Sequence, residues 1–395
     1  MIDRSLPGLD SSGCWAVPVR MNMATQCLAH DANKVAIIDL TGAARRDVSF
    51  GELTGKVDGL ARALRQRVQA NDRVGVLLSQ SPWCAAAHLA IWKIGAISVP
   101  LFKLFKHDAL ASRVQDAGIT LVLTDTEGRD LLGDLAQAEM ADSFGIAGDP
   151  VATADTGPED PAVLIYTSGT TGTPKGAVHG HRVLTGHLPG VSLSHDILGQ
   201  DGDCLWTPAD WAWIGGLFDV LMPGLALGVP VVAARLPKFS IEACVQIIRD
   251  GDVRNVFFPP TALRMLKAGA CSIAGLRSVA SGGEPLGAEM LAWGQTAFGL
   301  SINEFYGQTE CNMVASSSGT QFPPRPGCIG KPVPGHDVAV LDADGAPAQG
   351  EGDVAIRKGS ASMMLGYWQR PEETALKYRG DWMLTGDRGM FDGEY

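Results

Sequence analysis

One stretch decides the fold of this chain: Leu164-Ile165-Tyr166-Thr167-Ser168-Gly169-Thr170-Thr171-Gly172-Thr173-Pro174-Lys175-Gly176. The apolar run from Ala162 to Ile165 predicts a buried strand that leads into it. The loop that follows is rich in glycine and hydroxyl side chains, and it carries one lysine. Glycine allows close approach and positive φ, so backbone N–H groups and hydroxyls can surround one anion. The stretch therefore predicts a phosphate-binding loop.

This loop does not have the Walker sequence, in which Ser or Thr follows Gly-Lys. Here Pro174 precedes Lys175, and Gly176 follows it. A Ser/Thr/Gly-rich segment of this kind can also be a flexible surface loop between a strand and a helix. The neighbouring sequence has to decide between these two interpretations.

Composition limits the kind of protein that this can be. The chain has 395 residues, 46% of them hydrophobic, which predicts two or three units with sizeable cores. A net charge of −11 argues weakly against nucleic acid as a partner. None of the eight cysteines forms a C-x-x-C pair, so they are expected to be reduced thiols of a cytoplasmic protein.

Neither a signal peptide nor a membrane span is expected. The N-terminus has no signal sequence. The longest apolar run, from Leu217 to Ala234, is interrupted by Asp219 and two prolines. This run predicts a helix, a turn and a buried strand rather than a span.

Predicted strands and helices alternate along most of the chain. The first examples are a helix over 51–69, with one apolar face, and a strand over 73–78. The alternation resumes after the loop and continues to a strand over 302–306. It predicts an α/β fold, with two similar α/β subdomains and largely parallel sheets. Short alternating runs from about Gly327 predict a small antiparallel, barrel-like β unit. The approximate boundaries are 1–185, 186–322 and 323–395.

The second informative string is Glu304-Phe305-Tyr306-Gly307-Gln308-Thr309-Glu310, at the end of a predicted strand. Open α/β sheets bind ligands at such strand ends. Tyr306 could stack on a purine, Thr309 could donate to a phosphate oxygen, and Glu310 is a hard oxygen ligand suited to Mg²⁺. A core tyrosine and a helix N-terminal glutamate are the structural alternatives.

Three further strings follow the same pattern. Gly283-Glu284-Pro285 lies between a predicted strand and a helix, where it could also be an ordinary turn. Thr385-Gly386-Asp387 offers a carboxylate that can accept two donors at once. In the segment 207–216, Trp211 and Trp213 are flanked by glycine, which predicts an apolar slot or two core tryptophans.

Taken in order, these strings resemble the motifs of the AMP-forming acyl-CoA synthetases of the short/medium-chain type, members of the acyl-adenylate-forming superfamily. The resemblance implies an acetyl-CoA synthetase-like fold and ATP-dependent conversion of a carboxylic acid to acyl-AMP and then acyl-CoA, with ATP, Mg²⁺ and CoA. It implies catalytic roles for Thr167, Lys175 and Glu310, with Glu310 as the metal ligand. It implies ATP or AMP binding by Thr167, Ser168, Gly169, Thr170, Thr171, Gly172, Lys175, Gly283, Glu284, Pro285, Glu304, Phe305, Tyr306, Gly307, Gln308, Thr309 and Asp387. It implies an acyl pocket lined by Trp211, Trp213, Gly215 and Gly307.

The chain departs from this family in two places. Members continue past the Thr-Gly-Asp motif into a smaller C-terminal domain that carries a catalytic lysine, whereas this sequence ends at Tyr395. A weakly active, truncated chain is therefore expected. Acetate-specific relatives have Trp where this chain has Gly307. A deeper pocket is expected, for a medium-chain, branched or aromatic acid rather than acetate.

Two other functions remain open at this point. One is an adenylating enzyme that loads a carrier protein, and the other is a non-catalytic module that binds a nucleotide or acyl-adenylate. The expected partners are the acid, ATP and CoA, without nucleic acid. The oligomeric state is open, a dimer included.

Overall fold

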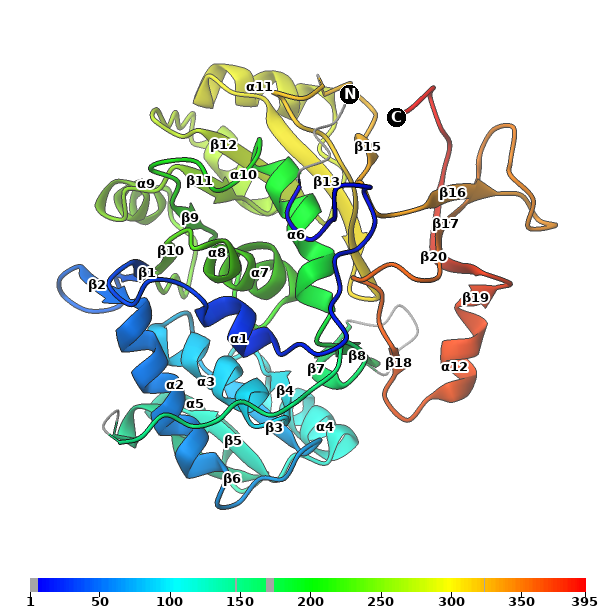
Figure 1. Cartoon of the computed structure of the whole chain (residues 1–395). Helices are drawn as coiled ribbons and strands as arrows, with labels where there is room; N and C mark the ends of the chain where they lie inside the picture. Colours follow the sequence, from blue (N-terminus) through cyan, green and yellow to red (C-terminus); the bar gives the residue numbers. More distant parts are fainter. Residues whose placement is uncertain (1–5, 146–147, 168–173, 323) are drawn as a thin grey trace. The chain divides into compact units, whose positions relative to one another are not determined.

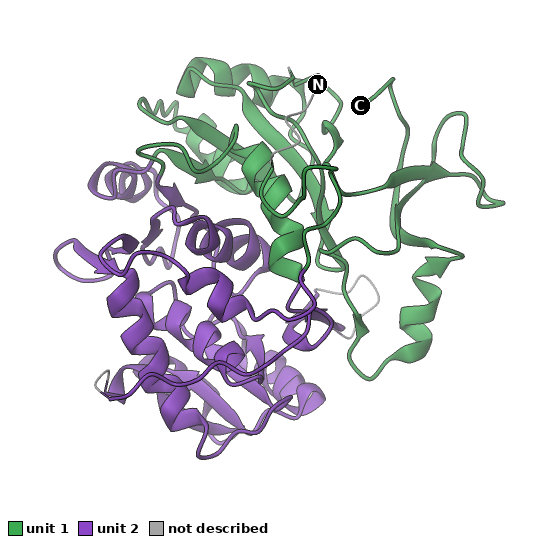
Figure 2. Ribbon diagram, in the orientation of Figure 1, with its two compact units in different colours: residues 1–17, 183–203, 254–395 green, residues 18–182, 204–253 purple. Residues whose placement is uncertain are grey.

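The computed structural model describes residues 6–145, 148–167, 174–322 and 324–395, and divides into two compact units (Figure 2). Unit 1 contains residues 1–17, 183–203 and 254–395; unit 2 contains residues 18–182 and 204–253. Each unit is therefore built from segments that are separated along the chain.

Unit 2 is built on two groups of strands (Figure 1). In the first, the strand order is β8-β7-β4-β3-β5-β6, all parallel except β8, which is antiparallel to β7. These strands are β3 (Arg73–Leu77), β4 (Ile97–Pro100), β5 (Leu121–Thr124), β6 (Gln137–Met140), β7 (Pro161–Tyr166) and β8 (Gly176–Gly180). In the second, β9 (Leu205–Trp206), β10 (Val231–Ala233) and β1 (Val35–Asp39) are parallel, and β2 (Arg46–Ser49) is antiparallel to β1.

Helices accompany these strands in the predicted alternation. They are α1 (Met23–Leu28), α2 (Phe50–Leu64), α3 (Pro82–Lys93), α4 (His107–Ala117), α5 (Thr126–Leu132), α7 (Ile214–Gly216), α8 (Met222–Leu227) and α9 (Ile241–Asp250), with a 3₁₀ turn η1 (Ala141–Ser143) and a π-helical turn η2 (Leu217–Leu221). The helix α2 shows why the sequence folds this way. Its N-cap Ser49 accepts the Glu52 N–H, and apolar side chains such as Leu53 and Leu60 are buried on one face. It ends earlier than predicted, because buried Val68 lies beyond a turn rather than in the helix.

Unit 1 contains the second α/β arrangement and the small β unit. Its strands β11 (Asn255–Phe257), β12 (Ser278–Gly282) and β13 (Ile302–Gln308) are parallel, and β14 (Cys311–Ser316) and β15 (Lys331–Pro332) continue antiparallel. Its helices are α6 (Val183–Ser194), α10 (Pro260–Ala268), α11 (Ala288–Phe298) and α12 (Pro371–Leu376). An antiparallel sheet in the order β16-β17-β20-β19 follows, made of β16 (Val338–Leu341), β17 (Gly352–Arg357), β20 (Trp382–Gly389) and β19 (Tyr378–Arg379), and β18 is Gly366–Tyr367. The predicted fold class is confirmed.

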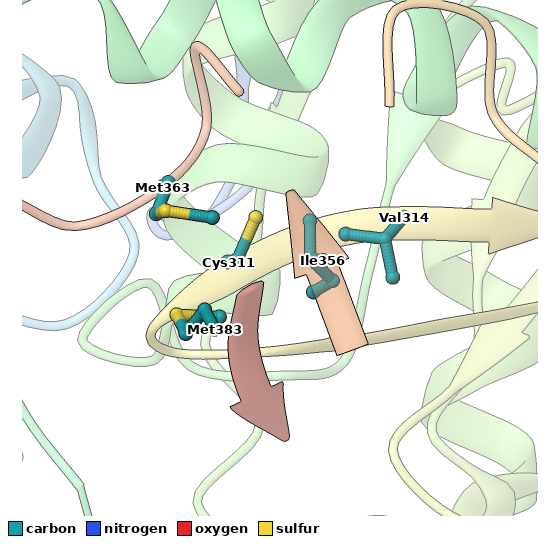
Figure 3. Packing of buried hydrophobic residues seen from close by; sticks show 5 residues of the cluster. All are labelled: Cys311, Val314, Ile356, Met363 and Met383. Carbon is teal, nitrogen blue, oxygen red and sulfur yellow. The ribbon is translucent and has the colours of Figure 1, made fainter. Parts of the chain in front are cut away.

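A buried cluster fixes the small sheet to the hairpin formed by β13 and β14. It joins Cys311 and Val314 of β14 to Ile356 of β17 and Met383 of β20, with Met363 beside them (Figure 3). All of these side chains are almost completely buried. Their packing holds the C-terminal strands of unit 1 in a fixed place relative to β13.

The helix α6 lies unusually close to its neighbours in unit 1. A Cβ added at Gly186 would be 2.1 Å from the backbone nitrogen of Ser362, and one at Gly190 would be 2.7 Å from the Met313 Cβ. Backbone atoms cannot give way as a flexible side chain can. These two glycines therefore allow α6 to pack directly on β14 and on the segment around Ser362.

Among the described residues, no helix is both long and apolar enough to cross a bilayer.

Buried histidines make the stability of the fold depend on pH. Burial lowers the pKa of His88 and His336 to about 3 and that of His181 and His195 to about 4. In an unfolded chain these imidazoles titrate near pH 6.5. Below that pH the unfolded state binds more protons than the folded state, so stability falls as the pH falls from about 6.5 toward 4.

We therefore expect the melting temperature to fall continuously between pH 7 and pH 5, with each such histidine costing about 1–2 kcal/mol at pH 5. Circular dichroism melts across this range measure the effect. His88→Leu should reduce the slope of melting temperature against pH, whereas His107→Asn, at an exposed side chain, should leave it unchanged. A melting temperature that does not vary over this range would contradict the prediction.

Candidate functional site

The string from Glu304 to Glu310 forms most of β13 and the turn after it. The strand continues to Gln308, further than predicted, and the chain then reverses through Thr309 and Glu310 into β14. The end of β13, where the sequence predicts a ligand to bind, is thus one strand of a β-hairpin. The sequence did not indicate β14, because its polar and small residues give no clear strand pattern.

The first residues of this string point into the protein. The Glu304 carboxylate accepts the Leu286 N–H at 3.1 Å, and burial raises its pKa. The Phe305 ring is buried and packs on Phe257 with centroids 5.2 Å apart. These two side chains support the strand from within.

Gly307 leaves no room for a side chain. A Cβ there would lie 2.0 Å from Asn312 Oδ1 and 2.8 Å from Asn312 Cα. The β13–β14 register shifts between Tyr306 and Gln308, on either side of this glycine. Glycine is therefore needed here for the hairpin itself, whatever it does for a ligand.

A hydrogen-bonded group connects β13 to the Thr385-Gly386-Asp387 string, which lies within strand β20. The Tyr306 hydroxyl donates to Asp387 Oδ2 at 2.5 Å, and Gln308 Nε2 donates to the same oxygen at 2.8 Å. Gln308 Nε2 also donates to the Thr385 carbonyl at 2.9 Å. Burial, and then the Asp387 carboxylate, raise the pKa of Tyr306. The structure thus brings together three residues that the sequence analysis assigned to the nucleotide.

Glu310 lies next to this group at the hairpin turn. Its side chain is only 9% exposed, Oε1 accepts the Tyr367 hydroxyl at 2.5 Å, and its carbonyl accepts the Met364 N–H at 2.8 Å. In the described part of the chain, no cationic side chain forms an ion pair with this carboxylate. A nearly buried carboxylate in that situation fits a hard divalent cation.

Any metal ion at Glu310 would need most of its ligands from elsewhere. The described residues contain no group of three or more His, Cys, Asp or Glu side chains that could hold an ion. Mg²⁺ commonly keeps water and substrate phosphates as ligands beside one or two carboxylates. The donor set therefore fits an ion that arrives with a nucleotide.

The remaining predicted nucleotide residues of unit 1 lie in turns. Gly283, Glu284 and Pro285 are exposed between β12 and α11, and Gly283 has a φ of 103°. The Glu284 carboxylate pairs with Arg264 at 2.6 Å. Thr309 is half-buried in the hairpin turn. Their roles stay predictions.

In unit 2, the predicted phosphate-binding loop connects two paired antiparallel strands, β7 and β8. Tyr166 is opposite Gly176, and the Thr167 N–H donates to the Lys175 carbonyl at 2.9 Å. The element after the loop is therefore strand β8 before any helix, which the sequence analysis missed. Ser168, Gly169, Thr170, Thr171 and Gly172 lie outside the described residues.

The two tryptophans of the predicted acyl pocket differ in their surroundings. Trp211 is fully buried, whereas Trp213 is 40% exposed, with Gly215 half-buried two residues later. Trp213 lines a pocket of unit 2. The other lining residues are Pro100, Phe102, Phe105, Arg113, Tyr166 and Ala212. Trp211 is not among them, so only one of these tryptophans has a surface that a ligand in this pocket could touch.

No pattern in the sequence indicated Tyr367 or Arg113. Tyr367 lies 57 residues after Glu310, and nothing local connects the two. The Arg113 guanidinium is buried in the unit 2 pocket and lies 4.0 Å from the centre of the Phe105 ring. The sequence marks Arg113 only as a cationic residue within a helix that has an apolar face.

Comparisons with known proteins identify the family and the fold of this chain. The family model for AMP-binding enzymes matches residues 24–368. Acetyl-coenzyme A synthetase of Bacillus subtilis (strain 168) is 29% identical over 393 residues, covering 92% of this chain and 68% of that protein. The crystal structure of Brucella canis acyl-CoA synthetase has a TM-score of 0.85 at 27% identity, covering 94% of this chain and 73% of that one. ATP-bound MatB from Rhodopseudomonas palustris has a TM-score of 0.82 at 26% identity, covering 94% and 77%.

Proposed function

Because the chain belongs to the AMP-binding enzyme family, with acyl- and acetyl-CoA synthetases among its relatives, we propose that it joins a carboxylic acid to AMP at the expense of ATP and passes the acyl group to CoA. The observation that carries the proposal is Glu310. This carboxylate is nearly buried, forms no ion pair within the described chain, and lies beside the Tyr306, Gln308 and Asp387 group.

The proposed reaction has two steps. A carboxylate oxygen of the acid attacks the α-phosphorus of ATP, and the bond to the bridging oxygen breaks to release pyrophosphate. The CoA thiol, after losing its proton, then attacks the acyl carbon and AMP leaves. The acid is already a nucleophile, so the protein has to offset the repulsion between two anions and hold them in line.

We assign these tasks to residues that the sequence motifs predict. Thr167 and Lys175 of unit 2 would bind phosphate oxygens, because a hydroxyl and an ammonium group are suitable donors. In unit 1, Asp387 would accept ribose hydroxyls and Tyr306 would stack on adenine. Glu310 would hold Mg²⁺, which when bound offsets phosphate charge. Thr309 would donate to the α-phosphate.

ATP–pyrophosphate exchange tests the proposal. The chain is incubated with ATP, Mg²⁺ and labelled pyrophosphate, with and without a carboxylic acid, and thioester formation is then measured after CoA is added. Acid-dependent exchange and acid-dependent thioester support a synthetase. Exchange without thioester, but with transfer to a carrier protein, would favour a carrier-loading enzyme. ATP binding without exchange would indicate that the chain is a non-catalytic nucleotide-binding module.

The proposed acid is medium-chain, branched or aromatic. One observation supports this: residue 307 is glycine rather than a bulky aromatic residue. A small residue at this position favours an acid larger than acetate.

We expect exchange to be fastest with acids larger than acetate, and each added methylene that is bound to raise kcat/KM by roughly tenfold or more. A series of straight-chain acids together with isobutyrate and benzoate measures this. An optimum at acetate would contradict it. The series is a cleaner test than Gly307→Trp, because a Cβ at 307 would first displace Asn312.

A further inference from the structure

We propose that Tyr306 acts on the ribose of the nucleotide through Asp387: its hydroxyl holds the carboxylate in the orientation that accepts the ribose hydroxyls. Tyr306 is then a positioning residue for sugar recognition, in addition to any contact of its ring with the base. The inference rests on the proposed function, since it concerns how the same nucleotide is bound.

The two donors share one oxygen of the Asp387 carboxylate. Tyr306 Oη and Gln308 Nε2 both donate to Oδ2 of Asp387, at 2.5 and 2.8 Å. Among the described residues, no group donates to Oδ1. The side chain of Asp387 is exposed. Two protein donors thus fix one oxygen and leave the other available to a ligand.

Both donors, Tyr306 and Gln308, are held in place by further contacts. Tyr306 lies on β13 and packs against the buried cluster that contains Cys311 and Met383. Gln308 uses its amide nitrogen for both the Thr385 carbonyl and the Asp387 carboxylate. Since both partners are acceptors, they fix which end of the amide is the nitrogen. Both donors are therefore anchored on the hairpin.

Without these two donors, the Asp387 carboxylate would be free to rotate. Asp387 follows Gly386, whose φ is 89°, in an exposed part of strand β20 where the pairing with β17 is irregular. Its own backbone N–H donates to Thr385 Oγ1 at 3.1 Å, which fixes the main chain but not the carboxylate. A carboxylate that is free to rotate loses conformational entropy when a ligand binds, and the two donors remove that cost beforehand.

The test compares ATP with 2′,3′-dideoxy-ATP, which lacks the hydroxyls that Asp387 would accept. Tyr306→Phe keeps the ring and removes the hydroxyl. Titration calorimetry of the unsubstituted chain and the variant should show ATP binding about tenfold weaker in Tyr306→Phe. Binding of the dideoxy nucleotide should stay within about twofold, because it does not use the oriented carboxylate. Gln308→Met should give the same pattern.

Tyr378→Phe is the matched control. Tyr378 packs on the same buried cluster, and no hydrogen bond joins it to Asp387 among the described residues. It should leave the affinity for both nucleotides unchanged, and melting temperatures of all variants verify folding.

Equal weakening for ATP and the dideoxy nucleotide in Tyr306→Phe would overturn the inference, because the hydroxyl would then act on the base or the fold. Unchanged ATP binding would also overturn it. If the unsubstituted chain binds no ATP, the proposed function fails and the inference fails with it. If that chain binds ATP but shows either of the first two results, only the inference fails.

Discussion

Replacing Glu310 with glutamine is expected to lower ATP–pyrophosphate exchange by about 10²–10³-fold, the rough contribution of several kcal/mol that a metal ion makes to phosphoryl chemistry. Glutamine keeps the size of the side chain and its contact with the Tyr367 hydroxyl, but it removes the charge. Glu310 is only 9% exposed, so bulk water cannot replace what is lost. The affinity of ATP should also become far less dependent on Mg²⁺ concentration, which equilibrium binding measures without turnover.

The matched control is Glu289→Gln. Glu289 is an exposed glutamate of α11 that pairs with Lys267 at 2.6 Å, and an exposed pair contributes little. It should exchange pyrophosphate at the unsubstituted rate. Tyr367→Phe should give an intermediate loss, because it keeps the charge of Glu310 and removes one donor. Near-normal exchange by Glu310→Gln would show that this carboxylate does not hold the metal ion.

Replacing Gly186 with alanine is expected to destabilise unit 1 by about 3 kcal/mol, the upper range for forcing extra atoms into a packed core. In an isolated helix the same change would stabilise by roughly 1 kcal/mol, because alanine has the highest helix propensity. Here the new Cβ would be 2.1 Å from the backbone nitrogen of Ser362 and 2.4 Å from the carbonyl carbon of Ala361. The close contact therefore opposes the gain in helix propensity. The sign of the change in unfolding free energy shows which of the two dominates.

Urea unfolding measures this effect as a shift of the midpoint at constant slope. Gly350→Ala is the control, because a Cβ at Gly350 has no heavy atom within 4 Å and its backbone does not need a positive φ. It should unfold at the same urea concentration as the unsubstituted chain. A higher midpoint for Gly186→Ala would show that α6 can move away from the Ser362 segment at little cost.

The parts of this structure that sequence patterns predict are those with a local cause. The helix α2 has an N-cap at Ser49 and an apolar face, and the α/β alternation with its small β unit is confirmed. The predicted nucleotide residues Tyr306, Gln308 and Asp387 are also joined by hydrogen bonds.

The parts that sequence patterns did not predict depend on contacts between distant segments. The hydrogen bond from Tyr367 to Glu310 joins residues 57 positions apart. The sequence around neither residue predicts this contact. The strands β8 and β14 were missed because their sequences show no clear strand pattern, and each forms as the second strand of a hairpin. The lack of room for a side chain at Gly307 becomes visible only in the structure, where Asn312 lies beside it.

The order in which unit 1 is assembled has a consequence for synthesis on the ribosome. Every residue of α6 is buried, and the helix packs on β14, which follows it by roughly 120 residues. At about 5–20 residues per second, α6 waits on the order of ten seconds before its partner strand has been translated. During this interval the apolar surface of α6 lacks its partner strand, so slowing translation between α6 and β14 should lower the yield of folded protein.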